Sequence, residues 1–294
     1  LGQCLRILKV RRADLAIGVG GYTSPMMILA AALRGVVRVI LEPNANPGVA
    51  NKAIGPLAHR VFLAFESAAD SFDHSKVRVV GTPIRKAFLE GSYRAREKSM
   101  PFHLLVFGGS QGAKAVNTAL MGALSELMTQ LPQLTVTHQT GESDHARVAE
   151  AYRLAGIESR VEAVPFLYDM PAALREADLV IARAGAMTVA ELTACGKAAI
   201  LIPLPSAIYD HQTKNAKVME ATGAAVLLPQ STLTGPALAH TVVGILGNPQ
   251  RLQDMGAASL SMRRIDAAEA IVHECYLLMG DYHDVNHSVG AAGI

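Results

Sequence analysis

Short apolar runs recur along the chain and alternate with longer segments that have the apolar spacing of helices. Runs typical of buried strands lie at residues 14–19, 37–41, 60–65, 77–81, 103–108, 134–139, 160–164, 178–182, 198–203 and 224–229. The segment at residues 113–131 shows the intervening pattern, with apolar positions three or four residues apart. Strands that alternate with helices predict βαβ units and a parallel sheet, so we expect an α/β protein.

The number of strands bears on the number of domains. Ten strands are too many for one compact doubly wound sheet in a chain of 294 residues, so we expect two sheets. The polar stretch at residues 86–101 has the composition of a linker. We therefore expect a first domain over residues 1–85 and a second over residues 102–250, with a disordered tail at residues 280–294.

Composition and charge exclude several classes of protein. Half of the residues are hydrophobic, 5% are aromatic and none is Trp, which is typical of α/β proteins with buried strands. A net charge of +2 argues against a dedicated nucleic-acid-binding protein. Cys4, Cys195 and Cys275 lie far apart, which predicts neither a disulfide framework nor a zinc site and favours a reducing compartment.

Neither a membrane span nor a signal peptide is predicted. The most apolar stretch, residues 198–208, is short and is interrupted by Pro203 and Pro205. The chain begins with Leu1, and its first residues have the pattern of a helix that lacks its N-terminal cap. We therefore expect that an N-terminal portion is missing.

Two glycine-rich turns each follow a predicted strand. Their glycines include Gly20 and Gly21 in the first turn, and Gly108, Gly109 and Gly112 in the second. Backbone N–H groups at such turns can bind an anion, and the missing side chains let it approach. Neither turn is a Walker loop or a good dinucleotide fingerprint. An ordinary tight turn between strand and helix uses the same residues, so each turn alone leaves both interpretations open.

The stretch ADLVIARAGAMTVAEL, residues 177–192, is more informative. If a helix starts near Ala186, its free N–H groups can bind a phosphate. Glu191 then lies about 7 Å further along the helix axis, where its carboxylate could accept hydrogen bonds from a ribose diol. The alternative is a solvent-facing glutamate. Polar side chains also follow the next strand, where they suit sugar hydroxyls or form an ordinary exposed loop: Asp210, His211, Gln212 and Asn215.

Metal-binding patterns do not occur in this sequence. It has no Asp-x-Asp pair, no His-Glu-x-x-His motif and no Cys/His cluster, so we expect neither a metal nor a cofactor. A diphosphate would then be neutralised by helix N-termini, by the hydroxyls of Ser110 and Thr188, and by a cation such as Arg85.

Several motifs occur together in one order: GVGGYTS, GTPIR, FGGSQGAKAVN, PFLYDM, ARAGAMTVAEL and DHQTKNA. Over about residues 1–275 this set resembles the MurG family, the UDP-N-acetylglucosamine:lipid I N-acetylglucosaminyltransferases of bacterial peptidoglycan synthesis. The resemblance implies a GT-B fold, in which two Rossmann-like domains face a cleft and a C-terminal helix, at about residues 251–278, completes the first domain. It also implies inverting transfer of GlcNAc from UDP-GlcNAc to the 4-hydroxyl of MurNAc-pentapeptide on undecaprenyl diphosphate, without a tightly bound metal.

The resemblance assigns roles to individual residues. It implies that the diphosphate of the donor binds at Ser110, Ala186, Met187 and Thr188. It further implies that the ribose binds at Glu191, uracil at Leu167 and the GlcNAc hydroxyls at Gln212, and that Arg85 and Asn44 make additional contacts with the donor. The family has His-Glu-Gln-Asn where this chain has Leu41–Asn44, so Glu42 and Asn44 are the remaining catalytic candidates. The family's proposed base would precede Leu1, and we expect this chain to bind UDP-GlcNAc weakly without turnover.

Two other functions remain open from the sequence: a UDP-GlcNAc 2-epimerase, and a non-catalytic UDP-sugar-binding subunit. The resemblance also implies a peripheral protein at the cytoplasmic face of the plasma membrane. Basic and apolar residues near the N-terminus fit an anionic membrane surface, or else a solvated basic helix: Arg6, Lys9, Arg11 and Arg12 with Leu5, Ile7 and Leu8.

Overall fold

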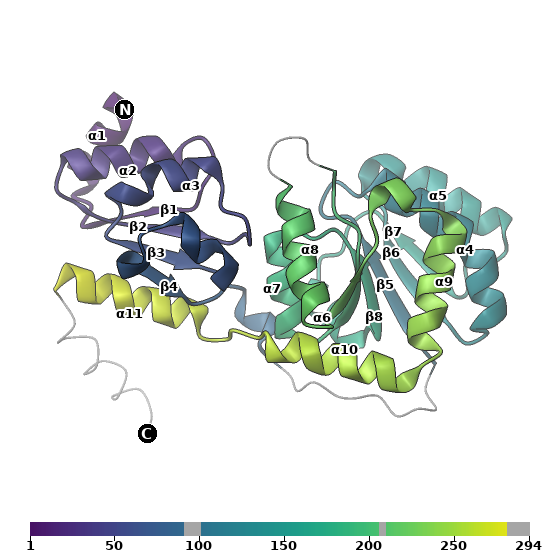
Figure 1. Cartoon of the computed structure of the whole chain (residues 1–294). Helices are drawn as coiled ribbons and strands as arrows, with labels where there is room; N and C mark the ends of the chain where they lie inside the picture. The colour runs from purple at the N-terminus through teal and green to yellow at the C-terminus, as the bar shows by residue number, and fades with distance from the viewer. Residues whose placement is uncertain (91–100, 206–209, 281–294) are drawn as a thin grey trace, which may run out of the picture. The chain divides into compact units, whose positions relative to one another are not determined.

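The chain forms two compact units (Figure 1). A computed structural model describes residues 1–90, 101–205 and 210–280. The first unit comprises Leu1–Pro83 together with the chain from Arg264 onward, and the second comprises Ile84–Arg263. Each unit has its own parallel sheet, so the expected pair of α/β sheets is confirmed.

The first unit contains a four-stranded parallel sheet in the order β1-β2-β3-β4. Its strands are β1 (Leu15–Gly18), β2 (Val37–Glu42), β3 (Arg60–Leu63) and β4 (Val77–Val79). Its helices are α1 (Gly2–Arg11), α2 (Ser24–Leu33), α3 (Val49–Ile54) and α11 (Ala267–Met279), with short 3-10 helices η1 (Gly55–Leu57), η2 (Glu66–Ser71) and η3 (His74–Lys76). Leu8 of α1 and Ile28 of α2 pack on one side of the sheet, while Ile271 and Cys275 of α11 pack with Val39 on the other.

The second unit contains a six-stranded parallel sheet in the order β10-β9-β8-β5-β6-β7. Its strands are β5 (His103–Phe107), β6 (Thr135–Gln139), β7 (Val161–Val164), β8 (Leu179–Ala182), β9 (Ala198–Leu201) and β10 (Ala225–Leu227). Its helices are α4 (Lys114–Gln130), α5 (Glu142–Leu154), α6 (Met170–Glu176), α7 (Ala186–Ala194), α8 (His211–Ala221), α9 (Gly235–Leu246) and α10 (Pro249–Ser261), with η4 (Lys86–Phe88) and η5 (Gln230–Thr232). Figure 1 shows α7 and α8 on one side of these strands and α4, α5 and α9 on the other.

Each of the ten predicted runs coincides with one strand, although β2 extends one residue beyond its run, to Glu42. Every residue of β8 and of β9 is buried, because helices cover both faces of a doubly wound parallel sheet. The segment predicted to be helical at residues 113–131 is α4, Lys114–Gln130. Among the described residues, no helix is both long enough and apolar enough to cross a membrane.

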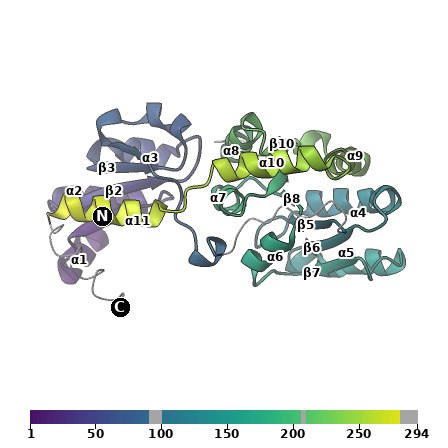
Figure 2. The ribbon, with the colours of Figure 1, turned by 90° about the horizontal axis from the view of Figure 1, so that it is seen from below.

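The chain returns to the first unit later than expected. The returning helix was placed at about residues 251–278, but α10 belongs to the second unit, where it contacts α7, α9 and β9. Met255 is buried there, and the Ser259 hydroxyl donates to the Leu192 carbonyl over 3.4 Å. Of the two helices α10 and α11, it is α11 that packs on the first sheet (Figure 2). Residues 91–100 of the expected linker and 281–294 of the expected tail lie outside the described residues.

Candidate functional site

The strand order of the second sheet changes direction between two neighbouring strands, β5 and β8. From β5 the chain moves outward through β6 and β7, and it then returns to β8 on the other side of β5. The loops that follow β5 and β8 therefore leave the same edge of the sheet toward opposite faces. Such a switch point is the usual ligand site of open α/β sheets. The second glycine-rich turn follows β5, and the stretch around Gly185 follows β8.

The glycine-rich turn after β5 is held close to the backbone of its neighbours. Gly112 has φ 72° and donates its N–H to the Gly109 carbonyl over 2.8 Å. A side chain at Gly112 would collide with the Thr140 carbonyl, which only glycine avoids. Gln139, buried in β6, donates to the carbonyls of Gly109 (3.0 Å) and Pro165 (3.3 Å). The turn is thereby fixed, with Ser110 exposed.

A buried polar network lies behind this turn. Asn117 of α4 donates through Nδ2 to the Thr140 carbonyl (2.9 Å) and to Oδ2 of Asp144 (2.7 Å). Its Oδ1 must then accept from Nε2 of His138 (3.0 Å), which leaves Nδ1 of His138 to accept from the Tyr152 hydroxyl (2.7 Å). Burial lowers the pKa of His138 to about 4, so the imidazole is neutral at neutral pH.

Helix α7 begins without a side-chain cap. Its N-cap is Gly185, and its first turn holds no acidic residue. By contrast, a side chain caps the N-terminus of α6 (Asp169), of α9 (Thr234) and of α10 (Asn248). The N–H groups of Ala186, Met187 and Thr188 are therefore open to an external acceptor, and the helix dipole favours a negatively charged one.

Glu191 lies one turn further into α7 and carries a half-buried carboxylate. Among the described residues, none forms a hydrogen bond or an ion pair with this carboxylate. Burial raises the pKa of Glu191, and the positive charge of Arg85 opposes that rise. A partly buried acceptor without a partner is costly unless a ligand or water supplies the donors, so this position suits a diol.

Arg183 connects the loops that follow β8 and β9. Its side chain is 9% exposed and donates to the carbonyls of Ile202 (3.0 Å) and Pro203 (3.1 Å) and to Oε1 of Gln230 (2.6 Å). Burial lowers the pKa of Arg183, and among the described residues no carboxylate forms an ion pair with it. The cation therefore adds positive potential three residues before the start of α7.

The remaining predicted positions of the second unit lie in adjoining loops. Gln212, in the first turn of α8, accepts at Oε1 from the Leu204 backbone N–H over 2.9 Å. Leu167 follows β7 and is half-buried between two exposed rings, Phe166 and Tyr168, whose centroids are 5.1 Å apart. Residues 206–209, next to Asp210, lie outside the described residues.

In the first unit, the geometry argues against a catalytic role for Glu42. Its carboxylate is 2% exposed and accepts four hydrogen bonds, from N (3.0 Å) and Nδ2 (3.1 Å) of Asn44, from N of Gly48 (2.9 Å) and from Nδ2 of Asn51 (2.9 Å). A carboxylate enclosed in this way fixes the loop after β2 and presents no oxygen to a reacting group. Glu42 is thus a positioning residue for Asn44, and its expected catalytic role is not supported.

The first glycine-rich turn also belongs to the first unit. Gly20 and Gly21 have φ 89° and 74°, and the Ser24 hydroxyl donates to the Gly20 carbonyl over 2.5 Å. The predicted residues thus divide between the units. Those in the second unit are Arg85, Gly108, Gly109, Ser110, Gly112, Leu167, Ala186, Met187, Thr188, Glu191 and Gln212, and those in the first are Gly20, Gly21, Glu42 and Asn44.

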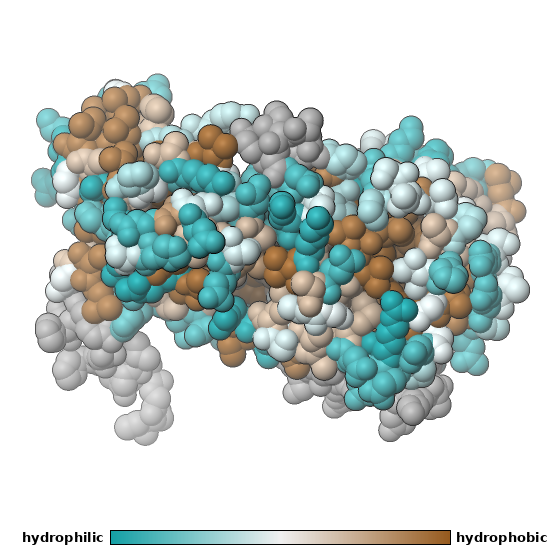
Figure 3. Space-filling view, in the orientation of Figure 1, coloured by the Kyte–Doolittle hydropathy of each residue, from teal (hydrophilic) through white to brown (hydrophobic). Residues whose placement is uncertain are grey.

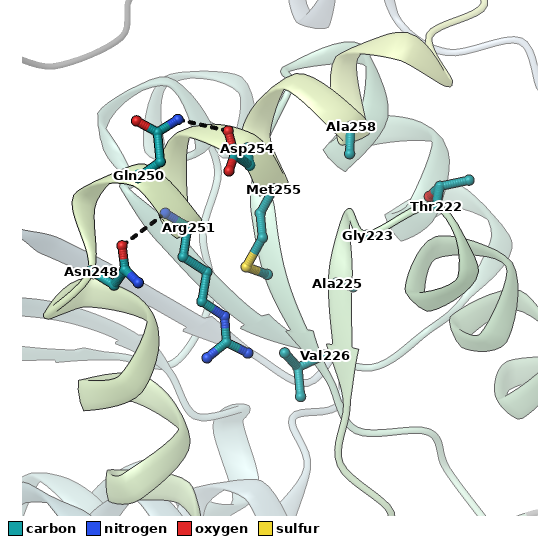
Figure 4. A pocket seen from close by; sticks show the side chains of 10 residues that line it. All are labelled: Thr222, Gly223, Ala225, Val226, Asn248, Gln250, Arg251, Asp254, Met255 and Ala258. Carbon is teal, nitrogen blue, oxygen red and sulfur yellow. Dashed lines mark hydrogen bonds between the residues drawn. The ribbon is translucent and has the colours of Figure 1, made fainter.

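A separate hollow of about 530 Å³ lies at the amino end of β10. The candidate site, by contrast, lies at the carboxyl ends of β5 and β8. Figure 4 shows the hollow beneath the first turns of α10. Its polar groups serve that helix: Asn248 accepts from the Arg251 backbone N–H (3.1 Å), and Gln250 donates to Asp254 (2.8 Å). The hollow includes no residue predicted for the donor. Within residues 1–90, 101–205 and 210–280, no group of three or more His, Cys, Asp or Glu side chains could hold a metal ion.

Comparison with family models defines the class of this protein. The glycosyltransferase family 28 N-terminal domain matches residues 1–63, and the glycosyltransferase family 28 C-terminal domain matches residues 103–271. Together with the two parallel sheets, these matches confirm the expected GT-B class of two Rossmann-like domains. The chain is therefore a hexosyltransferase of family 28.

Individual relatives specify the family within that class. The UDP-N-acetylglucosamine--N-acetylmuramyl-(pentapeptide) pyrophosphoryl-undecaprenol N-acetylglucosamine transferase of Syntrophus aciditrophicus is 46% identical over 95% of this chain and 77% of that protein. Its namesake from Geobacter sp. strain M21 is 44% identical over 92% and 72%. The crystal structure of Acinetobacter baumannii MurG matches with a TM-score of 0.79 and 33% identity over 93% of this chain and 77% of that chain. The chain belongs to this family of transferases.

Structures of another enzyme share the fold alone. The crystal structure of a putative UDP-N-acetylglucosamine 2-epimerase from Listeria monocytogenes has a TM-score of 0.72 at 13% identity, over 94% of this chain and 77% of that chain. Identity at this level shows the shared fold alone. The chain spans about three quarters of the length of the transferases that it matches.

Proposed function

We propose that this protein transfers N-acetylglucosamine from UDP-GlcNAc to the 4-hydroxyl of MurNAc-pentapeptide carried on undecaprenyl diphosphate, the step from lipid I to lipid II. The two transferases described above carry this donor and acceptor in their names, at 46% and 44% identity. The observation that carries the donor site is the combination, in one helix, of an N-terminus without a side-chain cap and the half-buried carboxylate of Glu191, for which the described residues provide no hydrogen-bond or ion-pair partner.

The donor is proposed to lie across the switch point of the second sheet. Its diphosphate accepts hydrogen bonds from the first N–H groups of α7, at Ala186, Met187 and Thr188, and from the Ser110 hydroxyl. The ribose hydroxyls donate to Glu191, and Arg85 adds a positive charge beside that carboxylate. The other assignments are uracil to the backbone at Leu167 and the GlcNAc hydroxyls to Gln212.

The proposed reaction is a single displacement with inversion. The acceptor hydroxyl oxygen forms a bond to the anomeric carbon of GlcNAc as the bond from that carbon to the UDP oxygen breaks. The hydroxyl proton passes to a general base, and the electron pair of the breaking bond leaves with UDP. Negative charge therefore grows on the diphosphate, and donors already fixed at the start of α7 stabilise that charge without reorganising.

We also propose that α1 contacts the anionic surface of the cytoplasmic face of the plasma membrane, where the lipid-linked acceptor would be. Two of the apolar residues expected to do so are unsuitable: Leu8 is buried and Leu5 packs on the core of the first unit. Ile7 and Val10 are instead 50% and 69% exposed. Figure 3 shows apolar side chains over α1 with hydrophilic ones around them. A basic helix with exposed apolar residues suits an anionic lipid surface.

An assay with UDP-GlcNAc and a lipid I analogue, carried out on this chain preceded by the N-terminal segment of a related transferase, separates the proposed function from its rivals. The chain by itself is expected to bind UDP-GlcNAc without turnover, so it serves as the binding control. Transfer produces a lipid II analogue and UDP in equal amounts, and only when the acceptor is present. A 2-epimerase would convert UDP-GlcNAc to the 2-epimer without an acceptor, and a non-catalytic subunit would bind UDP-GlcNAc and form neither product. Either of these two outcomes would overturn the proposed transfer.

A further inference from the structure

The segment that enters the second unit, residues 84–90, is fixed by side chains from three different elements. Its three successive carbonyls at residues 87–89 each face a polar side chain. The contacts are Ala87 O with Arg175 Nη1 (3.1 Å), Phe88 O with Cys195 Sγ (3.8 Å) and Leu89 O with Arg263 Nη2 (3.3 Å). Because these side chains come from α6, the end of α7 and the residues after α10, the segment keeps a defined position on the second unit.

In this fixed segment the ring of Phe88 is buried, and the guanidinium of Arg85 lies at the surface. The Phe88 side chain is 3% exposed, whereas Arg85 is exposed. The guanidinium carbon of Arg85 lies 5.0 Å from the centroid of the Phe88 ring, within the range of a cation–π contact. An exposed arginine samples many rotamers unless a neighbour restrains it. Here a buried ring with a fixed backbone supplies that restraint.

The restrained cation is directed at the candidate site. The charge of Arg85 acts on the carboxylate of Glu191, which lies one turn inside α7. A cation and a carboxylate near the start of one helix present complementary groups to a ligand that has both phosphates and hydroxyls. A nucleoside diphosphate is such a ligand.

We propose that Phe88 is a positioning residue of the donor site: its ring restrains the Arg85 guanidinium, whose charge reaches Glu191, so that the guanidinium contacts the nucleoside diphosphate. This inference rests on the proposed function, because it takes the donor to lie at α7. Phe88 itself does not touch the ligand and acts only through Arg85. It follows that the effect of changing Phe88 on UDP affinity should disappear when Arg85 is absent.

A double-mutant cycle on UDP binding, measured by isothermal titration calorimetry, tests this dependence. Phe88→Leu keeps a buried apolar side chain but removes the aromatic face, and we expect the Kd for UDP to rise about three- to tenfold. Arg85→Ala should raise the Kd at least as much. The double variant should bind UDP no more weakly than Arg85→Ala alone, because the ring has no further route to the ligand.

Phe102→Leu is the matched control. Phe102 is a partly buried phenylalanine that packs on the core of the second unit, and it precedes β5 at the opposite end from the glycine-rich turn. This variant should lose comparable stability and keep the wild-type Kd. Arg85→Lys, which keeps the charge on a different head group, should recover part of the affinity.

Two results would overturn the inference. One is an unchanged Kd in Phe88→Leu, and the other is an equal loss of affinity from Phe88→Leu whether or not Arg85 is present. Failure of the proposed function looks different: UDP binds and the cycle shows coupling, but no GlcNAc reaches a lipid I analogue. A wild-type chain that bound no UDP would overturn both.

Discussion

Acidification from about pH 7 to about pH 5 should destabilise the second unit through one buried side chain, His138. Its imidazole is fully buried, and its two nitrogens are occupied by Tyr152 and Asn117. Burial lowers its pKa to about 4 in the folded state; the charge of Asp144 opposes this shift, and the charge of Arg147 adds to it. In the unfolded chain the same group has the ordinary pKa of 6.5, so it takes up a proton there first.

The sign and size of the effect follow from these two pKa values. Above about pH 6.5 both states hold a neutral imidazole, and the stability is at its full value. Between pH 6.5 and the folded pKa of about 4, only the unfolded state is protonated, so the free energy of unfolding falls as the pH falls. Between pH 7 and pH 5 the loss is about 2 kcal/mol, which corresponds to roughly 4–8 °C in melting temperature for a unit of this size.

Urea unfolding over a pH series, followed by circular dichroism, measures this loss. Hydrogen exchange of peptides from residues 134–154 assigns the transition to the second unit. That assignment matters because burial also lowers the pKa of His59, in the first unit. His138→Gln keeps a donor and an acceptor but does not titrate, so it should be less stable at pH 7 and lack the additional loss below it. His240→Gln, at an exposed position, should behave as wild type.

The comparison of wild type with His138→Gln decides the matter. If both proteins lost the same stability between pH 7 and pH 5, the imidazole would not be the titrating group. The buried network behind the glycine-rich turn would then have been assigned the wrong protonation state.

Three further variants test other parts of the account. Gly112→Ala should be less stable than Gly109→Ala by roughly 1–3 kcal/mol in thermal melts, because both residues have positive φ but only the first would place a side chain against a backbone carbonyl. Arg183→Met should lower the free energy of unfolding by roughly 1–3 kcal/mol, since it leaves buried acceptors unpaired, and should also reduce the stabilisation of the protein by UDP. The double variant Ile7→Glu with Val10→Glu should float less with vesicles that contain anionic phosphatidylglycerol. Equal flotation of wild type and variant, or of wild type with and without anionic lipid, would remove α1 from the membrane surface.

Much of the fold could be predicted because its strongest signal is local. Strands that are buried on both faces give continuous apolar runs, as at Leu179–Ala182 and Ala198–Leu201. The start of α7 at Ala186 was also predictable, because an apolar run that ends in Gly185 marks a turn from strand to helix. The position of α10 was not, since an amphipathic helix near a domain boundary carries no local signal for the unit on which it packs.

The buried polar residues were harder to predict. Asn117, His138 and Arg183 are polar types that usually lie at the surface, and their partners are distant in sequence. A partial signal existed, because His138 lies on the same strand face as Val136 by simple alternation. Glu42 shows the opposite case: its chemistry suits catalysis, which stays a prediction, but the folded loop brings four donors around its carboxylate.

A crystal structure of the UDP complex tests the central claim most directly. We expect oxygen atoms of the diphosphate within hydrogen-bonding distance of the N–H groups of Ala186–Thr188, and the ribose hydroxyls on the carboxylate of Glu191. Glu191→Ala crystals should show UDP at lower occupancy under the same conditions. UDP bound at another edge of the sheet, or with its phosphates held only through a divalent metal ion, would contradict the account.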